Sequence, residues 1–273
     1  MARAHGDLVE VASGYSTRVH DEGTGRTVVL LHGTPFDLRA WDPLVGALAG
    51  RCRTVRFDAR GHGAATAVPP GGYAQLAADV VAVMDRLDIA DAHVVGHSWG
   101  GQTAQQVALD HPERVNRLSL MCTRASPFPA FDAVAAGLRD GTADKEASLA
   151  RWFTPDELAA TESIVDAVRA WLHDADPQRW AEALEMIAAF DVLDRLHRVT
   201  VPTDLVAAEH DGVAVPGHMT EMAGALAVAS LTVVPGTRHL LPLQHPDEIA
   251  RILTGGPSCA RTPRPPRPTS SRS

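Results

Sequence analysis

The sequence predicts an α/β fold, built as a mostly parallel eight-stranded sheet with helices on both faces and a helical cap. Three observations predict it. Short apolar runs alternate with longer stretches of helical period, as in strands joined by crossover helices. The alternation is interrupted once, by some seventy residues of helical period alone. A Gly-x-Ser-x-Gly segment joins one expected strand directly to a helix.

The first half of the chain supplies six expected strands. Asp7–Ala12 and Tyr15–Asp21 form a hairpin with Ser13-Gly14 as its turn, and Thr27–Leu31 (TVVLL) is a buried strand. The other three are Arg53–Phe57, Ala92–Val95 and Val115–Met121. Apolar residues at helical spacing, such as those between Leu76 and Leu87, predict helices between the strands. The expected helices are Trp41–Ala49, Tyr73–Leu87 and Gly101–Asp110.

After this half, the strand signal stops and then resumes. Residues 126–197 read as helical throughout and are expected to cap a site, inserted into a core formed by 1–125 and 198–256. The resumed pattern predicts two strands and two helices, namely Thr203–Ala208, Pro216–Ala227, Ser230–Val234 and Pro246–Leu253. Residues 257–273 are rich in Pro, Arg and Ser and are expected to be disordered.

Composition excludes several function classes. The net charge of -8 argues against nucleic-acid binding, because an acidic protein repels phosphate backbones. No apolar run is long enough for a membrane helix or a signal peptide, so we expect a cytoplasmic protein. Cys52, Cys122 and Cys259 lack zinc-site spacing, and the thirteen histidines are expected mostly at the surface and in loops. We expect no metal and no cofactor.

The segment Gly96-His97-Ser98-Trp99-Gly100 carries the sharpest chemical signal. It lies between the strand AHVV and the helix QTAQQVAL. A nucleophilic serine must be held out from its scaffold by a tight strand-to-helix turn, and the flanking glycines allow the close backbone approach that such a turn needs. The motif alone is weak, but at a strand-to-helix junction it predicts Ser98 as a nucleophile.

A nucleophilic serine needs a base, and the base needs an orienting carboxylate. In enzymes with this turn the order along the chain is Ser, acid, His, with the last two in loops after late strands. His239 follows the strand SLTVV and Asp211 follows DLVAA. His245 and Glu209 remain the alternative base and acid. The segment MCTRA after Val115–Met121 contains no carboxylate.

An oxyanion hole should accompany this triad. Its donors are expected to be the backbone N–H groups of Trp99 and of Thr34, in the segment HGTP after TVVLL. His32 in that segment is expected to hold the loop in place, although it is also a pocket candidate. Asp58 and Arg60 are expected to brace their own turn by hydrogen bonds.

These motifs together resemble the α/β-hydrolase superfamily from about Asp7 to Leu253. The segments HGTP, DARGHG, GHSWGG, EHDGVAVP and the His239 loop occur in the family's order. Within it, the chain is similar to 3-oxoadipate enol-lactonases in DLRAWDPLV, LSLMCT, RWFTP and AFDVLDRLHRVTVPT. It has HGTP where those enzymes have an NSLG-like segment, and GHSWGG where they have a GLSMGG-like one. The resemblance implies an α/β-hydrolase fold and cleavage of an ester or lactone through an acyl-enzyme.

The cap is the expected source of specificity. The resemblance and the chemistry of a guanidinium make Arg151, Trp152 and Phe153 candidates to bind and cover a substrate carboxylate; Phe36 and Leu240 are further pocket candidates. Arg151 as a solvated residue and the aromatics as cap core are the open alternatives. The same triad serves perhydrolases, carbon–carbon bond hydrolases, acyltransferases and tailoring enzymes of specialised metabolism, and a few such folds only bind small ligands. A small-molecule ester or lactone is the expected partner of a monomer or homodimer.

Overall fold

The computed structural model describes residues 8–12, 14–160 and 163–255. Within these residues one eight-stranded sheet has the order β1-β2-β4-β3-β5-β6-β7-β8. The strands are β1 Leu8–Ala12, β2 Tyr15–Glu22, β3 Thr27–Leu31, β4 Arg53–Phe57, β5 Ala92–His97, β6 Val115–Met121, β7 Thr203–Ala208 and β8 Ala229–Val234. The pairs β1–β2 and β2–β4 are antiparallel and all the other pairs are parallel. The predicted fold class is confirmed.

The parallel strands read as continuous apolar runs because both of their faces are buried. Successive side chains of a strand point to opposite faces. In β3, Val28 and Leu30 therefore join one apolar cluster, while Val29 and Leu31 join another. Each cluster lies between the sheet and one layer of helices, which explains why TVVLL shows no polar alternation.

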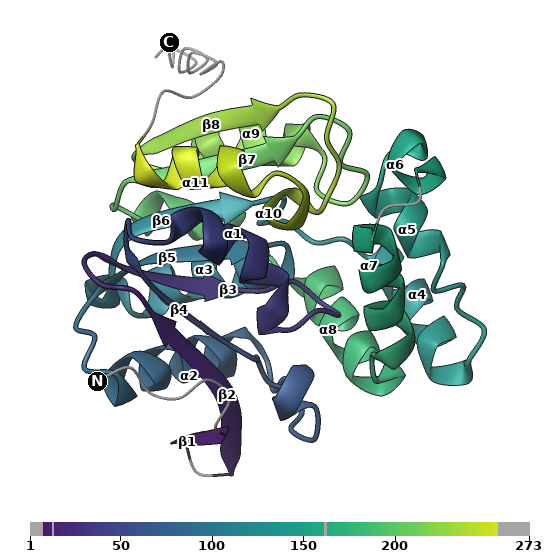
Figure 1. Cartoon of the computed structure of the whole chain (residues 1–273), viewed down its shortest axis with the longest axis horizontal. Coiled ribbons are helices and arrows are strands. Elements are labelled where there is room, and N and C mark those ends of the chain that lie inside the picture. Colours follow the sequence, from purple (N-terminus) through teal and green to yellow (C-terminus); the bar gives the residue numbers. More distant parts are fainter. Residues whose placement is uncertain (1–7, 13, 161–162, 256–273) are drawn as a thin grey trace, which may run out of the picture.

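Helices cover both faces of the sheet (Figure 1). One cluster is closed by α1 Asp42–Leu48 and α11 Pro246–Thr254. The other is closed by α2 Tyr73–Arg86, α3 Trp99–Asp110 and α9 Pro216–Ala225. Short 3₁₀ turns complete the core, at η1 Leu38–Trp41, η2 Gly63–Ala65, η3 Pro112–Arg114 and η4 Leu193–Arg198, with a single turn of helix at α10 Leu241–Gln244.

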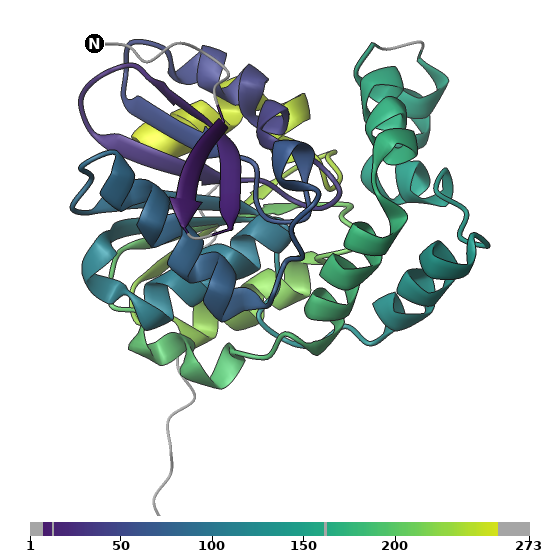
Figure 2. The ribbon, with the colours of Figure 1, turned by 90° about the horizontal axis from the view of Figure 1, so that it is seen from below.

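Between β6 and η4, the described part of the chain contains helices and no strand. We call these five the cap helices: α4 Ala130–Asp140, α5 Ala147–Trp152, α6 Pro155–Ala159, α7 Ser163–Asp174 and α8 Pro177–Ala189. Figures 1 and 2 show them on one side of the molecule, beyond the carboxyl ends of the parallel strands. They share a third apolar cluster with Phe36, Trp99 and Leu240 of the core. The carboxyl end of the sheet is therefore covered.

Some element boundaries differ from the prediction. The expected helix Trp41–Ala49 corresponds to α1, with Pro43 in its first turn, and the 3₁₀ turn η1, capped by the Asp37 carboxylate on the Arg39 N–H, precedes it. The short helix α10 was not predicted. Asp7, Ser13 and the tail 257–273 lie outside the described residues, so the predicted disorder of the tail stays a prediction. None of the described helices combines the length and apolar character needed to cross a membrane.

Candidate active site

Ser98 is the single residue between β5 and α3. The strand runs to His97 and the helix begins at Trp99, so the turn is tighter than predicted from the sequence. Ser98 has φ 54° and ψ -118°, a left-handed conformation that costs energy in a residue with a Cβ. Its N–H donates to the Met121 carbonyl at 2.9 Å, and its own carbonyl accepts from the Thr123 hydroxyl at 2.7 Å. These bonds hold the serine in the strained turn.

Two glycines make this turn possible. A Cβ on Gly100 would lie under 3.0 Å from the carbonyl oxygens of Leu31 and His32, and a Cβ on Gly96 would lie under 3.0 Å from the Gly100 carbonyl. The sequence motif therefore reflects direct contact between the backbones of β3, β5 and α3.

We expect Gly100→Ala to lower the free energy of unfolding by ~3 kcal/mol or more, because the new methyl meets backbone atoms that cannot move aside. Gly46→Ala is the matched control: Gly46 is in α1, and its Cβ would meet nothing within 4 Å. That change should raise the free energy of unfolding by ~0.5–1 kcal/mol through helix propensity. Urea titration measures the free energy of unfolding of both variants. Small and equal changes in the two would contradict the proposal that the turn at Gly100 has no room for a Cβ.

Ser98, His239 and Asp211 form one line of hydrogen bonds. His239 Nε2 lies 2.9 Å from Ser98 Oγ, and His239 Nδ1 lies 2.8 Å from Asp211 Oδ2. The other oxygen of Asp211 accepts from the N–H groups of Val213 (2.7 Å) and Ala214 (3.0 Å). Loops after β5, β7 and β8 thus bring together three residues far apart in the sequence. This is the arrangement of a nucleophile, a base and its orienting acid.

The Asp211 carboxylate is held in its charged form. Burial raises its pKa, but the electrostatic interaction and hydrogen bond with His239 and the N–H groups of Val213 and Ala214 outweigh burial and lower the pKa below its usual value. The alternatives considered from the sequence lie elsewhere. The Glu209 carboxylate accepts from the exposed Gly236 N–H, and the His245 N–H donates to the Leu241 carbonyl.

The two expected oxyanion donors lie on either side of the serine. Trp99 is the first residue of α3, so its N–H has no acceptor within the helix. Thr34 lines the same cavity as Ser98 and His239. Neither N–H donates a backbone hydrogen bond to another described residue. The loop of Thr34 lies against the nucleophile, since a Cβ on Gly33 would be 3.2 Å from the Ser98 Cβ. An oxyanion donor must be free of such hydrogen bonds, so the role of these two N–H groups stays a prediction that their hydrogen bonding allows.

Buried histidines hold this loop, as expected for His32. The His32 Nε2 accepts from the Ala59 N–H at 3.0 Å, and the Thr34 hydroxyl lies 2.8 Å from His62 Nε2. Burial, followed by the nearby His32, lowers the pKa of His62 to about 3, so His62 stays neutral. Five histidines are buried, namely His32, His62, His93, His97 and His239; the expectation of surface and loop histidines is wrong for His93 and His97, which lie in β5, while the other three lie in loops.

Asp58 and Arg60 brace their turn, as predicted. The Asp58 carboxylate accepts from the N–H groups of Leu38 (2.9 Å) and Ala64 (2.8 Å). The Arg60 guanidinium pairs with Asp79 at 2.5 Å and stacks over the ring of Tyr15. Their side chains therefore join two loops and a helix of the core and do not line the cavity at Ser98.

The cavity above Ser98 is lined mostly by the cap. Its wall comprises Thr34, Ser98, Phe131, Val134, Ser148, Arg151, Trp152, Trp180, Leu184, Ile187, Val213 and His239. Of the pocket candidates from the sequence, Arg151 and Trp152 are in this wall. Trp180, Leu184 and Ile187 were missed, although their spacing places them on one face of α8.

Four other pocket candidates do not line this cavity. His32 lines a small separate cavity beneath Trp99. Phe36 packs between the rings of Trp152 and Trp171, at 5.3 and 5.5 Å between centroids. Phe153 and Leu240 are fully buried in the apolar cluster that joins cap and core. Phe153 therefore belongs to the apolar core of the cap, which was the alternative to a role in covering the substrate.

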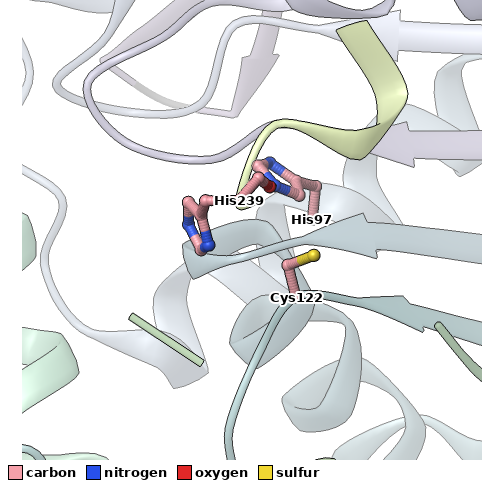
Figure 3. A group of neighbouring side chains, drawn as sticks. All are labelled: His97, Cys122 and His239. Carbon is pink, nitrogen blue, oxygen red and sulfur yellow. The ribbon is translucent and has the colours of Figure 1, made fainter. Parts of the chain in front are cut away.

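His97, Cys122 and His239 bring possible metal-ligand atoms within 4.8 Å of one another (Figure 3). Both ring nitrogens of His239 are already bonded to Ser98 and Asp211, and His97 Nε2 is bonded to a main-chain carbonyl. Burial, followed by the Asp211 charge, raises the pKa of the Cys122 thiol, so the neutral thiol is favoured here. This group fits a hydrogen-bonded support for the triad better than an ion site.

Comparison with known proteins agrees with this geometry. A model described as the alpha/beta hydrolase family matches residues 28–252. The 3-oxoadipate enol-lactonase 2 of Acinetobacter baylyi is 29% identical over 75% of this chain and 78% of its own. A Variovorax paradoxus protein that carries the name carbamate hydrolase RutD is 32% identical over 81% and 87%. The crystal structure of the Burkholderia xenovorans enol-lactonase superposes with a TM-score of 0.86 at 28% identity, over 91% of this chain and 98% of that one.

Proposed function

The chain is a hydrolase of the alpha/beta hydrolase family, and from this membership we propose that it cleaves a carboxylic ester or lactone through an acyl-enzyme on Ser98. One observation carries the proposal: the hydrogen-bonded line from Ser98 through His239 to the buried Asp211 carboxylate. A serine hydroxyl becomes a useful nucleophile only when a base of this kind accepts its proton.

The geometry supports a two-stage reaction. Ser98 Oγ attacks the acyl carbon while its proton passes to His239 Nε2, and Asp211 stabilises the resulting imidazolium. The oxygen of the tetrahedral intermediate accepts hydrogen bonds from the Thr34 and Trp99 N–H groups. His239 then returns the proton to the leaving oxygen, which departs as an alcohol or enol. Water attacks the acyl-enzyme by the same route and frees the acid.

The names of the relatives support acyl-carbon chemistry of this kind. One relative is named an enol-lactonase and another a carbamate hydrolase. Lactones and carbamates are both attacked at a carbonyl carbon, so one triad serves either. We favour the ester or lactone because enol-lactonases occur among both the sequence relatives and the solved structures.

We further propose that the substrate carries a carboxylate that binds Arg151. This side chain is half-buried in the wall of the cavity, and its described hydrogen bond is to the Ser148 hydroxyl at 3.0 Å. It forms no ion pair with a described residue. Burial lowers the pKa of the guanidinium, opposed by Asp144, but arginine stays charged in proteins. A half-buried cation with no acidic partner favours an anionic ligand.

We expect Arg151→Met to lower kcat/KM for a carboxylated lactone by ~10–100-fold, mainly through KM, because a charge-assisted hydrogen bond is lost. Hydrolysis of neutral p-nitrophenyl acetate should change little. The matched control is Arg169→Met: Arg169 is also in the cap, but it is paired with Glu146 and Asp166 away from the cavity. Equal losses on neutral and carboxylated substrates would contradict the proposed role of Arg151.

A panel of acyl substrates tests the function itself. It contains short p-nitrophenyl esters, neutral and carboxylated lactones and a simple carbamate, with Ser98→Ala as the blank. Preference for a carboxylated lactone is the expected result. Preference for the carbamate would change the proposed substrate class from an ester or lactone to a carbamate, and it would leave the proposed triad unchanged. Transfer of the acyl group to alcohol or peroxide, or cleavage of a carbon–carbon bond, would change the reaction class; labelling by a fluorophosphonate without turnover of any substrate would favour a ligand-binding role.

A further inference from the structure

His97 touches all three parts of the candidate site. It precedes Ser98 in the chain, so it belongs to the nucleophile turn. Its ring lies 5.0 Å from the His239 ring between centroids, and its Nε2 lies 2.7 Å from the main-chain carbonyl oxygen of His239 (Figure 3). Its Nδ1 would lie 3.0 Å from a Cβ on Gly33, which places the ring directly against the oxyanion loop. Nothing in the proposed reaction uses this ring as an acid or base.

The hydrogen bonding of His97 fixes its tautomer. A carbonyl oxygen only accepts, so His97 Nε2 carries the proton and donates it to the His239 carbonyl. Burial, followed by the nearby His239, lowers the pKa of His97 to about 3. The ring is therefore neutral, with an unprotonated Nδ1 on the side of Gly33. A neutral donor at this position adds no positive charge beside the base.

The bond to His97 holds the part of the loop that carries the base. His239 is held through its ring by Asp211 and Ser98, and the other main-chain hydrogen bonds of this loop lie on either side of it. Before it, the His210 N–H donates to the Thr237 carbonyl at 2.9 Å; after it, the N–H groups of Leu243 and Gln244 donate to the Leu240 carbonyl at 3.0 Å. The carbonyl of His239 itself is held by His97, and His239 is buried. Without this donor the peptide must turn towards another partner, and the imidazole attached to it turns too.

We propose that His97 is a positioning residue, which aligns the His239 imidazole on Ser98 Oγ by donating a hydrogen bond to the main-chain carbonyl of His239. The proposal rests on the function proposed for Ser98 and adds a fourth side chain to its machinery. It links the nucleophile turn and the base loop by a bond that takes no part in proton transfer.

The test compares His97→Leu with His97→Gln. The Gln amide nitrogen is the same number of bonds from Cβ as His Nε2, so Gln keeps the donor, whereas Leu fills the space without one. We expect His97→Leu to lower kcat on p-nitrophenyl acetate by ~10–100-fold with KM changed less than ~3-fold, because a small misplacement of a catalytic group is costly. His97→Gln should retain most of kcat. His97→Asn, whose amide is one bond too short to reach, should behave like the leucine variant.

The matched control is His93→Leu. His93 is also a fully buried neutral histidine of β5, and its Nε2 lies 2.8 Å from the Ser119 hydroxyl, at the end of the strand away from Ser98. Its replacement should cost thermal stability as His97→Leu does, but it should leave kcat unchanged. The comparison therefore separates loss of packing in β5 from loss of alignment.

A spectroscopic readout makes the result independent of turnover. The proton between His239 Nδ1 and Asp211 should give a downfield ¹H NMR resonance, assigned by its loss in Asp211→Asn. It should shift or broaden in His97→Leu and stay in His97→Gln. A leucine variant that keeps both kcat and this resonance would overturn the proposal. If the wild-type protein hydrolyses no ester, the function proposed above fails, while the resonance still decides the role of His97.

Discussion

Ser98→Ala should reduce kcat for any accepted ester by about 10⁶-fold. The loss is this large because the Ala side chain has nothing to form the covalent intermediate, and His239 Nε2 then faces no hydroxyl. The oxyanion donors remain, so a residual acceleration of ~10³–10⁴-fold over water is compatible with the mechanism. Initial rates of p-nitrophenyl ester hydrolysis measure the change.

The control for this prediction is a second serine in the same cavity. Ser148 is buried beside Arg151, and its oxygen accepts from that guanidinium and bonds to no histidine of the described residues. A fluorophosphonate probe should label the wild-type protein and Ser148→Ala but not Ser98→Ala. A folded Ser98→Ala protein that hydrolyses esters at a tenth of the wild-type rate would refute the assignment of the nucleophile.

Asp211→Asn should reduce kcat by about 10⁴-fold while the fold is kept. The two N–H groups of Val213 and Ala214 on one oxygen of Asp211 decide the orientation of the amide. They select the amide oxygen, which turns the NH₂ group towards His239 Nδ1. That nitrogen must then accept, so Nε2 carries the proton and cannot take another from Ser98. Glu209→Gln, at the alternative acid considered from the sequence, should change kcat by less than ~3-fold; the reverse ranking would make Glu209 the acid.

The pH profile gives a second readout for the same pair of residues. Because the pKa of Asp211 is lowered, its carboxylate is charged at neutral and mildly acidic pH. His62 and His97 have pKa values of about 3 and stay neutral over the same range. The fall of kcat/KM towards acid should therefore have the slope of one proton, with none taken up by Asp211, His62 or His97. If log kcat/KM falls with a slope of two protons above pH 4, the conclusion that Asp211 stays charged in this range is wrong.

Much of the fold was predictable because the sheet is buried on both sides. Strands such as Thr27–Leu31 and Val115–Met121 read as short apolar runs, and both occur in the structure with the predicted bounds. Turns were less predictable. Asp37 caps η1 with its side chain, and the proline of α10 follows Leu241, so local hydrogen bonds and prolines decided where these elements begin and end.

The cap shows the limit of helical periodicity. The period of apolar residues indicates which residues of a helix are buried, but not whether they face a cavity or another helix. Phe153 and Trp152 are adjacent in the sequence and belong to one apolar cluster, yet of the two only Trp152 also lines the cavity. Trp180, in α8, is three helices further along the chain and joins the same wall. Packing between helices decides such questions, and their relative rotation is not encoded in the period of any one helix.

By itself, the sequence determined the class of fold and the identity of the candidate triad. A glycine-flanked serine at a strand-to-helix junction and the order of acid and histidine after late strands are local signals, because backbone crowding and strand direction are local constraints. Only the tertiary structure decided that Arg151 lines the cavity without an acidic partner among the described residues, and that His97 holds the carbonyl of a residue 142 positions away. Such contacts form where segments distant along the chain meet, so no window of sequence contains them.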